Sequence, residues 1–240
     1  MGFSIYLGPY QPFLEQSLFN EVKELRQRDP LTPLVVLVPN RLLVRHLREA
    51  LAREHGQVFN IRFLTFHQYL MEATEGKWIQ EGFRMLPESL VPWVLRETAR
   101  GLKPALWSFK TVEETPGFHK TLQATLSELR QAGIDPADLK ESSRKIGKDK
   151  TRKRLSEKWD EFSRVLSAYD AWKKQEKWKD REDLYVDALT LPPPETPLWT
   201  YGFYDAPTLQ KKVLLHLTAK PEIATSPNAP IGAAPRDDSF

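Results

Sequence analysis

The residues whose spacing comes nearest to a catalytic motif begin at Gly8, where a phosphate-binding loop of the form G-x-x-x-x-G-K-[ST] would start. Counted from Gly8, the second glycine, the lysine and the hydroxyl positions of that loop hold Phe13, Leu14 and Glu15. No ammonium group would reach the phosphates, no hydroxyl would hold Mg²⁺, and Glu15 would repel a nucleotide. We therefore expect no ATP hydrolysis at this loop and interpret Gly8 as part of a tight turn.

A second candidate for nucleotide chemistry is the stretch from Tyr201 to Gln210, which follows a short apolar run. It resembles the second ATPase motif of superfamily-one DNA helicases, in which an Asp-Glu pair holds Mg²⁺ and positions the attacking water. Phe203, Asp205 and Gln210 match that motif, but Tyr201 and Gly202 occupy the places of the acidic pair. The sequence thus predicts a degenerate nucleotide site made of Gly8, Leu14, Glu15, Tyr201, Gly202, Asp205 and Gln210.

The remaining reactive residue types do not form a recognisable catalytic site. The chain has no cysteine, which excludes disulfides, iron–sulfur ligation and a cysteine-built zinc site within it, and its five histidines lack metal-ligand spacing. The nuclease-like pattern Glu-x-Lys occurs at Glu21 and at Glu75, but neither match has an acidic strand residue closely upstream to complete a magnesium site. We expect no catalytic residue, no metal and no cofactor.

Thr65, Phe66 and His67 directly follow a predicted strand and are candidates for a contact with nucleic acid. Phe66 could stack on a base, while Thr65 or His67 could reach a phosphate. Alternatively, Thr65 could cap a helix and Phe66 could be a buried aromatic, because stacking platforms and core aromatics look alike in sequence. The sequence leaves both interpretations open.

A basic cluster from Arg144 to Arg154 dominates the charge distribution of a chain whose net charge is only +3. It holds seven basic residues against a single acid, Asp149. Contact with a DNA backbone would make binding strongly dependent on salt, whereas a solvated loop is the usual role of a charge run. The candidate DNA contacts in this cluster are Lys148, Lys150, Arg152, Lys153 and Arg154. Three other arginines are interpreted as the solvent face of a helix: Arg41, Arg45 and Arg48.

The N-terminal part of the chain alternates strand and helix patterns with short connections. Residues 5–7, 34–38 and 61–64 are apolar runs typical of strands, and the valine-rich run at 34–38 is typical of a strand buried on both faces. Asn40 is expected to cap the helix that follows the second of these strands. This order predicts an α/β fold with a parallel, P-loop-like sheet and helices on both faces.

The middle of the chain is mostly helical in pattern. Its clearest helix runs from about Leu155 to Lys174 and carries an apolar stripe, interpreted as core or as a packing face for a partner: Trp159, Phe162, Val165, Leu166, Tyr169 and Trp172. The expected organisation is an α/β core of residues 1–76 plus 190–220, a helical insertion of residues 77–189 and a disordered tail of residues 221–240. No apolar run is long enough to span a membrane and no signal peptide opens the chain, so we expect a cytoplasmic protein.

Four stretches occur in the order found in the first motor domain of UvrD-type helicases: Pro39-Asn40-Arg41, Thr65-Phe66-His67, Asp180 to Leu184, and Tyr201 to Gln210. Together with the start at Leu7-Gly8-Pro9, they resemble the N-terminal, helicase-like part of AddB, the non-motor subunit of the bacterial AddAB helicase–nuclease. The resemblance covers roughly residues 1–217 and rests on the order and spacing of short motifs.

This resemblance implies a sheet like the 1A domain of superfamily-one helicases, with a 1B-like helical insertion. It also implies a non-catalytic role in DNA end processing and double-strand-break repair. The implied partners are an AddA-like helicase–nuclease motor subunit and DNA, as a single strand or a duplex end, without a membrane. The family's C-terminal nuclease and its iron–sulfur cluster would need cysteines and a longer chain, so we expect this sequence to be the N-terminal portion of such a subunit.

Two alternatives from other functional classes remain open. The chain could be a helical scaffold or interaction module unrelated to helicases, with the basic cluster binding RNA or an acidic protein. It could also be an active nucleotide-binding enzyme with a divergent loop.

Overall fold

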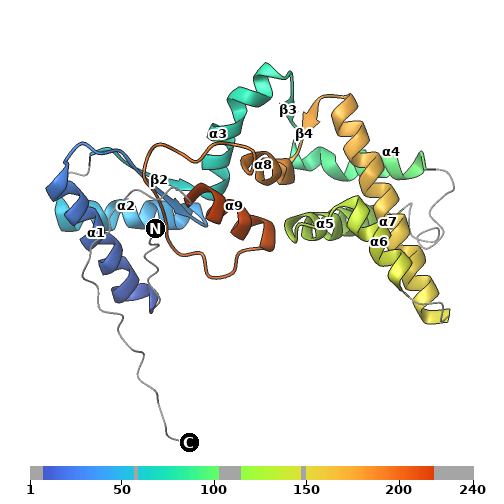
Figure 1. The fold of residues 1–240 in the computed structure, drawn as a ribbon, viewed down its shortest axis with the longest axis horizontal. Helices are drawn as coiled ribbons and strands as arrows, with labels where there is room; N and C mark the ends of the chain where they lie inside the picture. The colour runs from blue at the N-terminus through green and yellow to red at the C-terminus, as the bar shows by residue number, and fades with distance from the viewer. Residues whose placement is uncertain (1–7, 57–58, 103–114, 147–149, 219–240) are drawn as a thin grey trace, which may run out of the picture.

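A computed structural model of the chain describes residues 8–56, 59–102, 115–146 and 150–218. These residues form two lobes (Figure 1), one built around a small sheet and the other mainly from helices. No helix in the described ranges is long and apolar enough to cross a membrane. The strand expected at residues 5–7, the tail expected at 221–240 and Lys148 lie outside the described residues.

The sheet lobe is organised around strand β1 (Leu34–Val38), which is buried along its whole length. It pairs in parallel with β2 (Ile61–Thr65) on one side and with β5 (Leu198–Thr200) on the other, so the strand order is β2-β1-β5. The α/β class, the parallel pairing and the buried valine-rich strand are therefore confirmed. The helicase-like identity of the sheet stays a prediction.

One face of the sheet is covered by helices from the N-terminal part of the chain. A short helical turn, η1 (Tyr10–Leu14), leads into α1 (Glu15–Arg28), and α2 (Arg41–His55) follows β1. Alternate side chains of a strand point to the same face, and Val36 and Val38 accordingly pack with the apolar residues of α1 and α2. The predicted cap of α2 is confirmed, because the side chain of its N-cap asparagine accepts a hydrogen bond from a first-turn backbone N–H.

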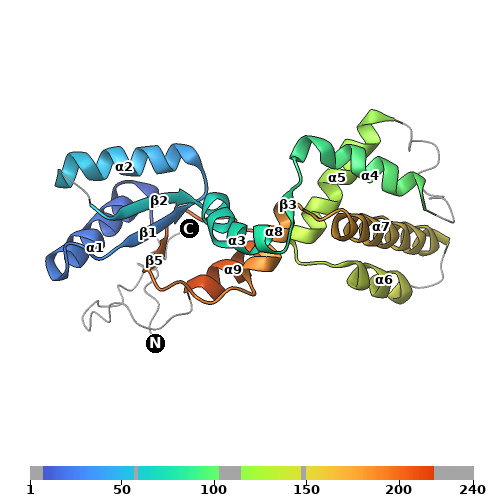
Figure 2. The same cartoon turned by 90° about the horizontal axis from the view of Figure 1, so that it is seen from above.

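The other face of the sheet is covered by α3 (Phe66–Gln80), α8 (Arg181–Ala188) and α9 (Thr208–Thr218). Val35 and Leu37 of β1 pack against the apolar residues of these three helices. Figure 2 shows that α3, α8 and α9 lie between the sheet and the helical lobe. Helices therefore cover both faces, as a parallel sheet requires.

The helical lobe is inserted between α3 and α8. Its helices are η2 (Glu88–Leu90), α4 (Val91–Arg100), α5 (Pro116–Gln131), α6 (Pro136–Lys145) and α7 (Lys150–Gln175). The apolar stripe of α7 faces the interior of this lobe, where Phe162, Val165, Leu166 and Tyr169 are buried against α4, α5 and α6. This stripe therefore forms the core of the lobe.

Two short strands carry the chain into and out of the helical lobe. They are β3 (Arg84–Met85) and β4 (Trp178–Lys179), which pair with each other in parallel, and we call this pair the neck. Helix α8 follows the neck directly and packs on the sheet lobe, although the expected insertion of residues 77–189 included it. The division of the chain into folding units stays a prediction.

Candidate functional site

The carboxyl ends of the three parallel strands lie at one edge of the sheet, and α2, α3 and α9 begin there. This edge faces the helical lobe across a cavity of about 980 Å³. Its walls come from both lobes, for example from Asn40 and His67 on the sheet side and from Leu95 and Leu126 on the helical side. Because ligands of open parallel sheets bind at the carboxyl edge, this cavity is the candidate functional site.

Three basic side chains stand at helix amino termini on the sheet-lobe wall of the cavity. They are Arg41 in α2, His67 in α3 and Arg181 in α8, and all three are exposed. A helix amino terminus carries partial positive charge and favours acidic residues, yet α2 and α3 have no acid in their first turns. The three side chains, which we call the basic rim, therefore create an edge that favours an anion.

The basic rim is only partly neutralised by its neighbours. Among the described residues Arg41 makes no ion pair, and Arg181 interacts with the hydroxyl of Tyr185. Partial burial and the charge of Arg181, with a smaller effect of Arg41, lower the pKa of His67 below its usual value, although Glu88 opposes this shift. The ring is therefore mostly neutral at pH 7, and a bound anion would favour its protonated form.

Thr65 and Phe66 take the packing role that the sequence left open. The hydroxyl of Thr65 accepts a hydrogen bond from the backbone N–H of Gln68 at 3.2 Å, and the side chain of Gln68 accepts one from the backbone N–H of Thr65 at 3.0 Å. Phe66 is only 3% exposed, and its ring lies 5.5 Å from that of Tyr185 and 6.0 Å from that of Phe203. The ring is thus closed to a base, which leaves the histidine as the exposed member of the triplet.

The residues of the expected degenerate nucleotide site occupy different surroundings. Gly202, Asp205 and Gln210 line the cavity, at the end of β5 and the start of α9. Leu14 and Tyr201 instead pack with the apolar residues of α1 and α2 on the far face of the sheet. Within this set, Gly202, Asp205 and Gln210 therefore lie at the cavity, whereas Leu14 and Tyr201 do not.

The segment from Gly8 to Glu15 is closed by its own contacts. The carboxylate of Glu15 lies 2.6 Å from Nε2 of His46 in α2. The ring of Phe13 covers Gly8 so closely that a Cβ at that glycine would overlap it. The backbone N–H of Leu14 donates to the carbonyl of Pro9 at 3.2 Å. A vestigial nucleotide site in this region stays a prediction.

The basic cluster at the start of α7 is separate from the cavity. Figures 1 and 2 show α7 beginning at the end of the helical lobe that lies farthest from the sheet. Lys153 and Arg154 are exposed, and Lys153 lies 3.9 Å from Glu157. Lys148 lies outside the described residues, and the structure describes only the backbone of Lys150 and Arg152. The structure therefore does not bring the basic cluster together with His67, the other candidate DNA contact.

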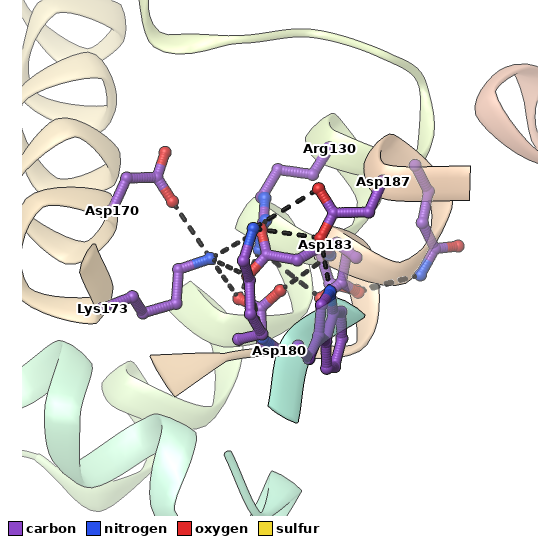
Figure 3. A network of polar contacts seen from close by, with 11 residues as sticks. Arg130, Asp170, Lys173, Asp180, Asp183 and Asp187 are labelled. Atoms are coloured by element: carbon purple, nitrogen blue, oxygen red, sulfur yellow. Dashed lines mark hydrogen bonds and ion pairs between the residues drawn. The ribbon is translucent and has the colours of Figure 1, made fainter. Parts of the chain in front are cut away.

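Buried polar contacts hold the first turn of α8 at the wall of the cavity (Figure 3). Asp180 is the N-cap of α8 and accepts a hydrogen bond from the backbone N–H of Asp183 at 3.1 Å, while the side chain of Asp183 accepts one from the backbone N–H of Asp180 at 2.8 Å. The same two carboxylates pair with Arg130 of α5 and Lys173 of α7. The Asp-x-x-Asp pattern is thus both a helix cap and an ion-pair centre.

The four ion pairs are short and shielded from solvent. Arg130 lies 2.5 Å from Asp180 and 2.7 Å from Asp183, and Lys173 lies 2.8 Å from each carboxylate. The side chains of Lys173 and Asp180 are each 4% exposed. A neighbouring acid, Glu182, accepts a hydrogen bond from the hydroxyl of Ser127 in α5 at 2.5 Å. The charges of these buried residues are therefore mutually satisfied and not available to a ligand.

The pKa values of the two aspartates diverge. Burial opposes the ionisation of Asp180, but the charges of Arg130 and Lys173 outweigh it and hold the pKa of that carboxyl below its usual range. Burial and the charge of Asp180 raise the pKa of Asp183. Two cations thus keep two neighbouring carboxylates in a space where an unpaired charge would be costly.

Sequence reasoning did not single out Arg130 and Lys173. A signal was present, because Lys173 stands four residues after Tyr169 and Arg130 stands four residues after Leu126, each on the apolar face of its helix. A cation on the buried face of a helix requires an anionic partner. Asp180 was recognised only as part of a motif.

One comparison with known proteins gives a match. A protein-family model described as "ADDB, N-terminal" matches residues 15–192. The matched region runs from the start of α1 through both lobes to just beyond α8, and so contains the basic rim and the buried ion pairs. No curated protein matches the chain.

Proposed function

The chain belongs to the "ADDB, N-terminal" family, and from this membership we propose that it is the non-catalytic, helicase-like part of an AddB-type subunit. In this role it takes part in DNA end processing and double-strand-break repair in the cytoplasm. It contacts an AddA-like motor subunit and guides a single strand of DNA along the carboxyl edge of its sheet.

The observation that carries the DNA contact is the basic rim. Arg41 and Arg181 are exposed cations without a carboxylate partner among the described residues, and each stands at the first position of a helix. At the start of α2, which has no acid in its first turn, the backbone N–H groups and the charge of Arg41 can act on the same phosphate. The first turn of α8 contains Glu182 and Asp183, so Arg181 contributes its side-chain charge alone. His67 adds a third contact, whose charged form a bound phosphate would favour.

The proposal includes no ATP turnover by this chain. At the place of the magnesium-binding hydroxyl in a phosphate loop, Glu15 contacts His46, and Phe13 covers Gly8. The position of the acidic pair holds Tyr201 and Gly202. Measuring phosphate release from ATP, with and without single-stranded DNA, tests this part: turnover above the buffer blank would contradict it.

DNA binding is tested by fluorescence anisotropy with a labelled single-stranded oligonucleotide. In the double variant Arg41→Ala with Arg181→Ala, the affinity for the oligonucleotide should fall by about tenfold or more. Each lost charged contact is worth about 1 kcal/mol or more. The matched control removes the same net charge from arginines that already pair with glutamates, Arg45→Ala with Arg96→Ala, and should bind like the original chain.

Three outcomes would contradict the DNA contact. The chain fails to bind the oligonucleotide at low salt, the two double variants weaken binding equally, or an RNA of the same length competes better than DNA. The last result would favour the alternative of an RNA-binding scaffold.

A further inference from the structure

The two lobes are joined by few chain segments. The neck consists of the two-residue strands β3 and β4, paired as Arg84 with Trp178 and Met85 with Lys179. Gly82, shortly before β3, has a φ of 75°, and Lys177, directly before β4, has a φ of 59°. A short neck that enters and leaves the lobe side by side provides little resistance to a change in the angle between the lobes.

The buried ion pairs cross this junction. Arg130 and Lys173 belong to α5 and α7 of the helical lobe, whereas Asp180 and Asp183 lie beyond the neck at the start of α8 (Figure 3). Helix α8 is fixed to the sheet lobe, since Leu184 and its apolar neighbours pack with α3 and α9. The four ion pairs therefore connect one lobe to the other. We call these four residues the clamp.

Additional polar contacts end on the same turn of α8. Ser127 donates to Glu182 at 2.5 Å, and Gln131 donates to the same carboxylate at 3.4 Å. On the sheet-lobe side, the indole N–H of Trp78 donates to Asp187 at 2.6 Å and ties α8 to α3. The first turn of α8 is thus one point at which the helical lobe is attached, beside a contact between α5 and α9, and the last turn of α8 is attached to the sheet lobe.

The composition of the clamp matters for what it can do. An apolar contact tolerates sliding because it has no preferred direction, whereas a guanidinium group that spans two carboxylates holds only in a narrow range of positions. A buried ion pair contributes little net stability compared with an apolar pair of the same volume, but losing one partner is costly. A clamp of this kind therefore selects one arrangement of the two lobes and excludes others.

We propose that the clamp fixes the angle between the helical lobe and the sheet lobe and thereby sets the width of the cavity. When the clamp opens, the helical lobe rotates about the neck while both lobes stay folded. The cavity changes with this rotation because its walls come from both lobes. This inference does not depend on DNA binding, since the clamp acts in the absence of any ligand.

The test measures the distance between the lobes. Because the chain has no cysteine, two cysteines introduced by Arg48→Cys in α2 and Lys140→Cys in α6 can carry spin labels without competing sites. Both positions are exposed. Pulsed electron paramagnetic resonance should give one narrow distance distribution for the labelled chain without DNA.

The main variant is Arg130→Met, added to the labelled chain. It should replace the narrow distribution by a broader and shifted one, while circular dichroism shows the same helical content. The control is Arg62→Met, which removes a cation that pairs with Glu72 at 2.6 Å entirely within the sheet lobe. The distance distribution of this control should match that of the unmodified labelled chain.

A second variant, Arg130→Lys, keeps the positive charge but lacks the guanidinium fork that reaches both carboxylates. It should broaden the distance distribution less than Arg130→Met does, and it should destabilise the fold less because the buried carboxylates keep a second cation. An unchanged narrow distribution in both variants would overturn the proposal. Loss of helical content in both would overturn it too, because a clamp between two preformed lobes must leave each lobe folded when it opens.

Discussion

The basic rim and the clamp use cations in opposite ways, although both involve the first turn of α8. Arg181 of the rim is exposed and faces the cavity, while its neighbour in sequence, Asp180, is buried between Arg130 and Lys173. An exposed cation without a carboxylate partner can exchange water for a phosphate at little cost. A buried cation that already has two carboxylates cannot leave them. Whether a cation can bind a ligand or instead holds the fold together therefore depends on whether a carboxylate already pairs with it.

The largest expected effect is on stability, from Arg130→Met. This variant leaves two buried carboxylates with one cation and should lower the free energy of unfolding by about 3 to 5 kcal/mol. Urea unfolding followed by circular dichroism measures it. The exposed pair Arg62–Glu72 gives the control, since Arg62→Met should cost about 1 kcal/mol or less. Equal losses in the two variants would show that the buried pairs are no more important than surface ones.

Phe66→Ala separates a core role from a base-stacking role. Removal of a ring that is 3% exposed should lower the free energy of unfolding by about 3 kcal/mol and leave the affinity for single-stranded DNA nearly unchanged at a temperature where the variant is folded. The opposite pattern, a stable variant that binds DNA more weakly, would restore the stacking interpretation.

A comparison of the two basic surfaces sharpens the assignment of the DNA contact. The double variant Lys153→Ala with Arg154→Ala at the start of α7 should weaken DNA binding by about twofold or less, because one of these residues lies near a glutamate and neither lines the cavity. The rim variant Arg41→Ala with Arg181→Ala removes the same number of charges. A larger loss at α7 than at the rim would move the DNA contact to the basic cluster.

The remaining expected effect is a dependence of binding on pH. The pKa of His67 is lowered in the free chain, so the ring gains its proton at a lower pH than an ordinary histidine does. A protonated ring adds a positive charge to the basic rim, and affinity for DNA should therefore increase by a few-fold between pH 7.5 and pH 5.5. His67→Gln should abolish this increase. An identical pH dependence in the variant would remove His67 from the contact.

Local patterns were sufficient to predict much of the sheet lobe. The run from Leu34 to Val38 is apolar at every position, which is the pattern of a strand buried on both faces. Asn40 marks the start of the next helix. The apolar stripe of α7 likewise predicted its buried face. These features depend on residues close together in the sequence, where the periods of strand and helix are fixed by geometry.

Features that depend on distant residues were beyond the sequence. Arg130 and Asp180 are fifty positions apart, and only the path of the chain through the neck brings them into contact. The choice between a stacking and a core role for Phe66 depended on Tyr185 and Phe203, which close over the ring from α8 and the end of β5. The basic rim was missed in part because Arg41 has the spacing of a solvent face, although its helix begins at the cavity.

The most direct test of the central claim is the salt dependence of DNA binding by the original chain and by the double variant Arg41→Ala with Arg181→Ala. We predict that the plot of log affinity against log salt is less steep in the variant by about 1.4, because each lost phosphate contact on a single strand lowers the slope by about 0.7. Equal slopes and equal affinities would contradict the claim that the unpaired cations at the carboxyl edge of the sheet bind the DNA backbone.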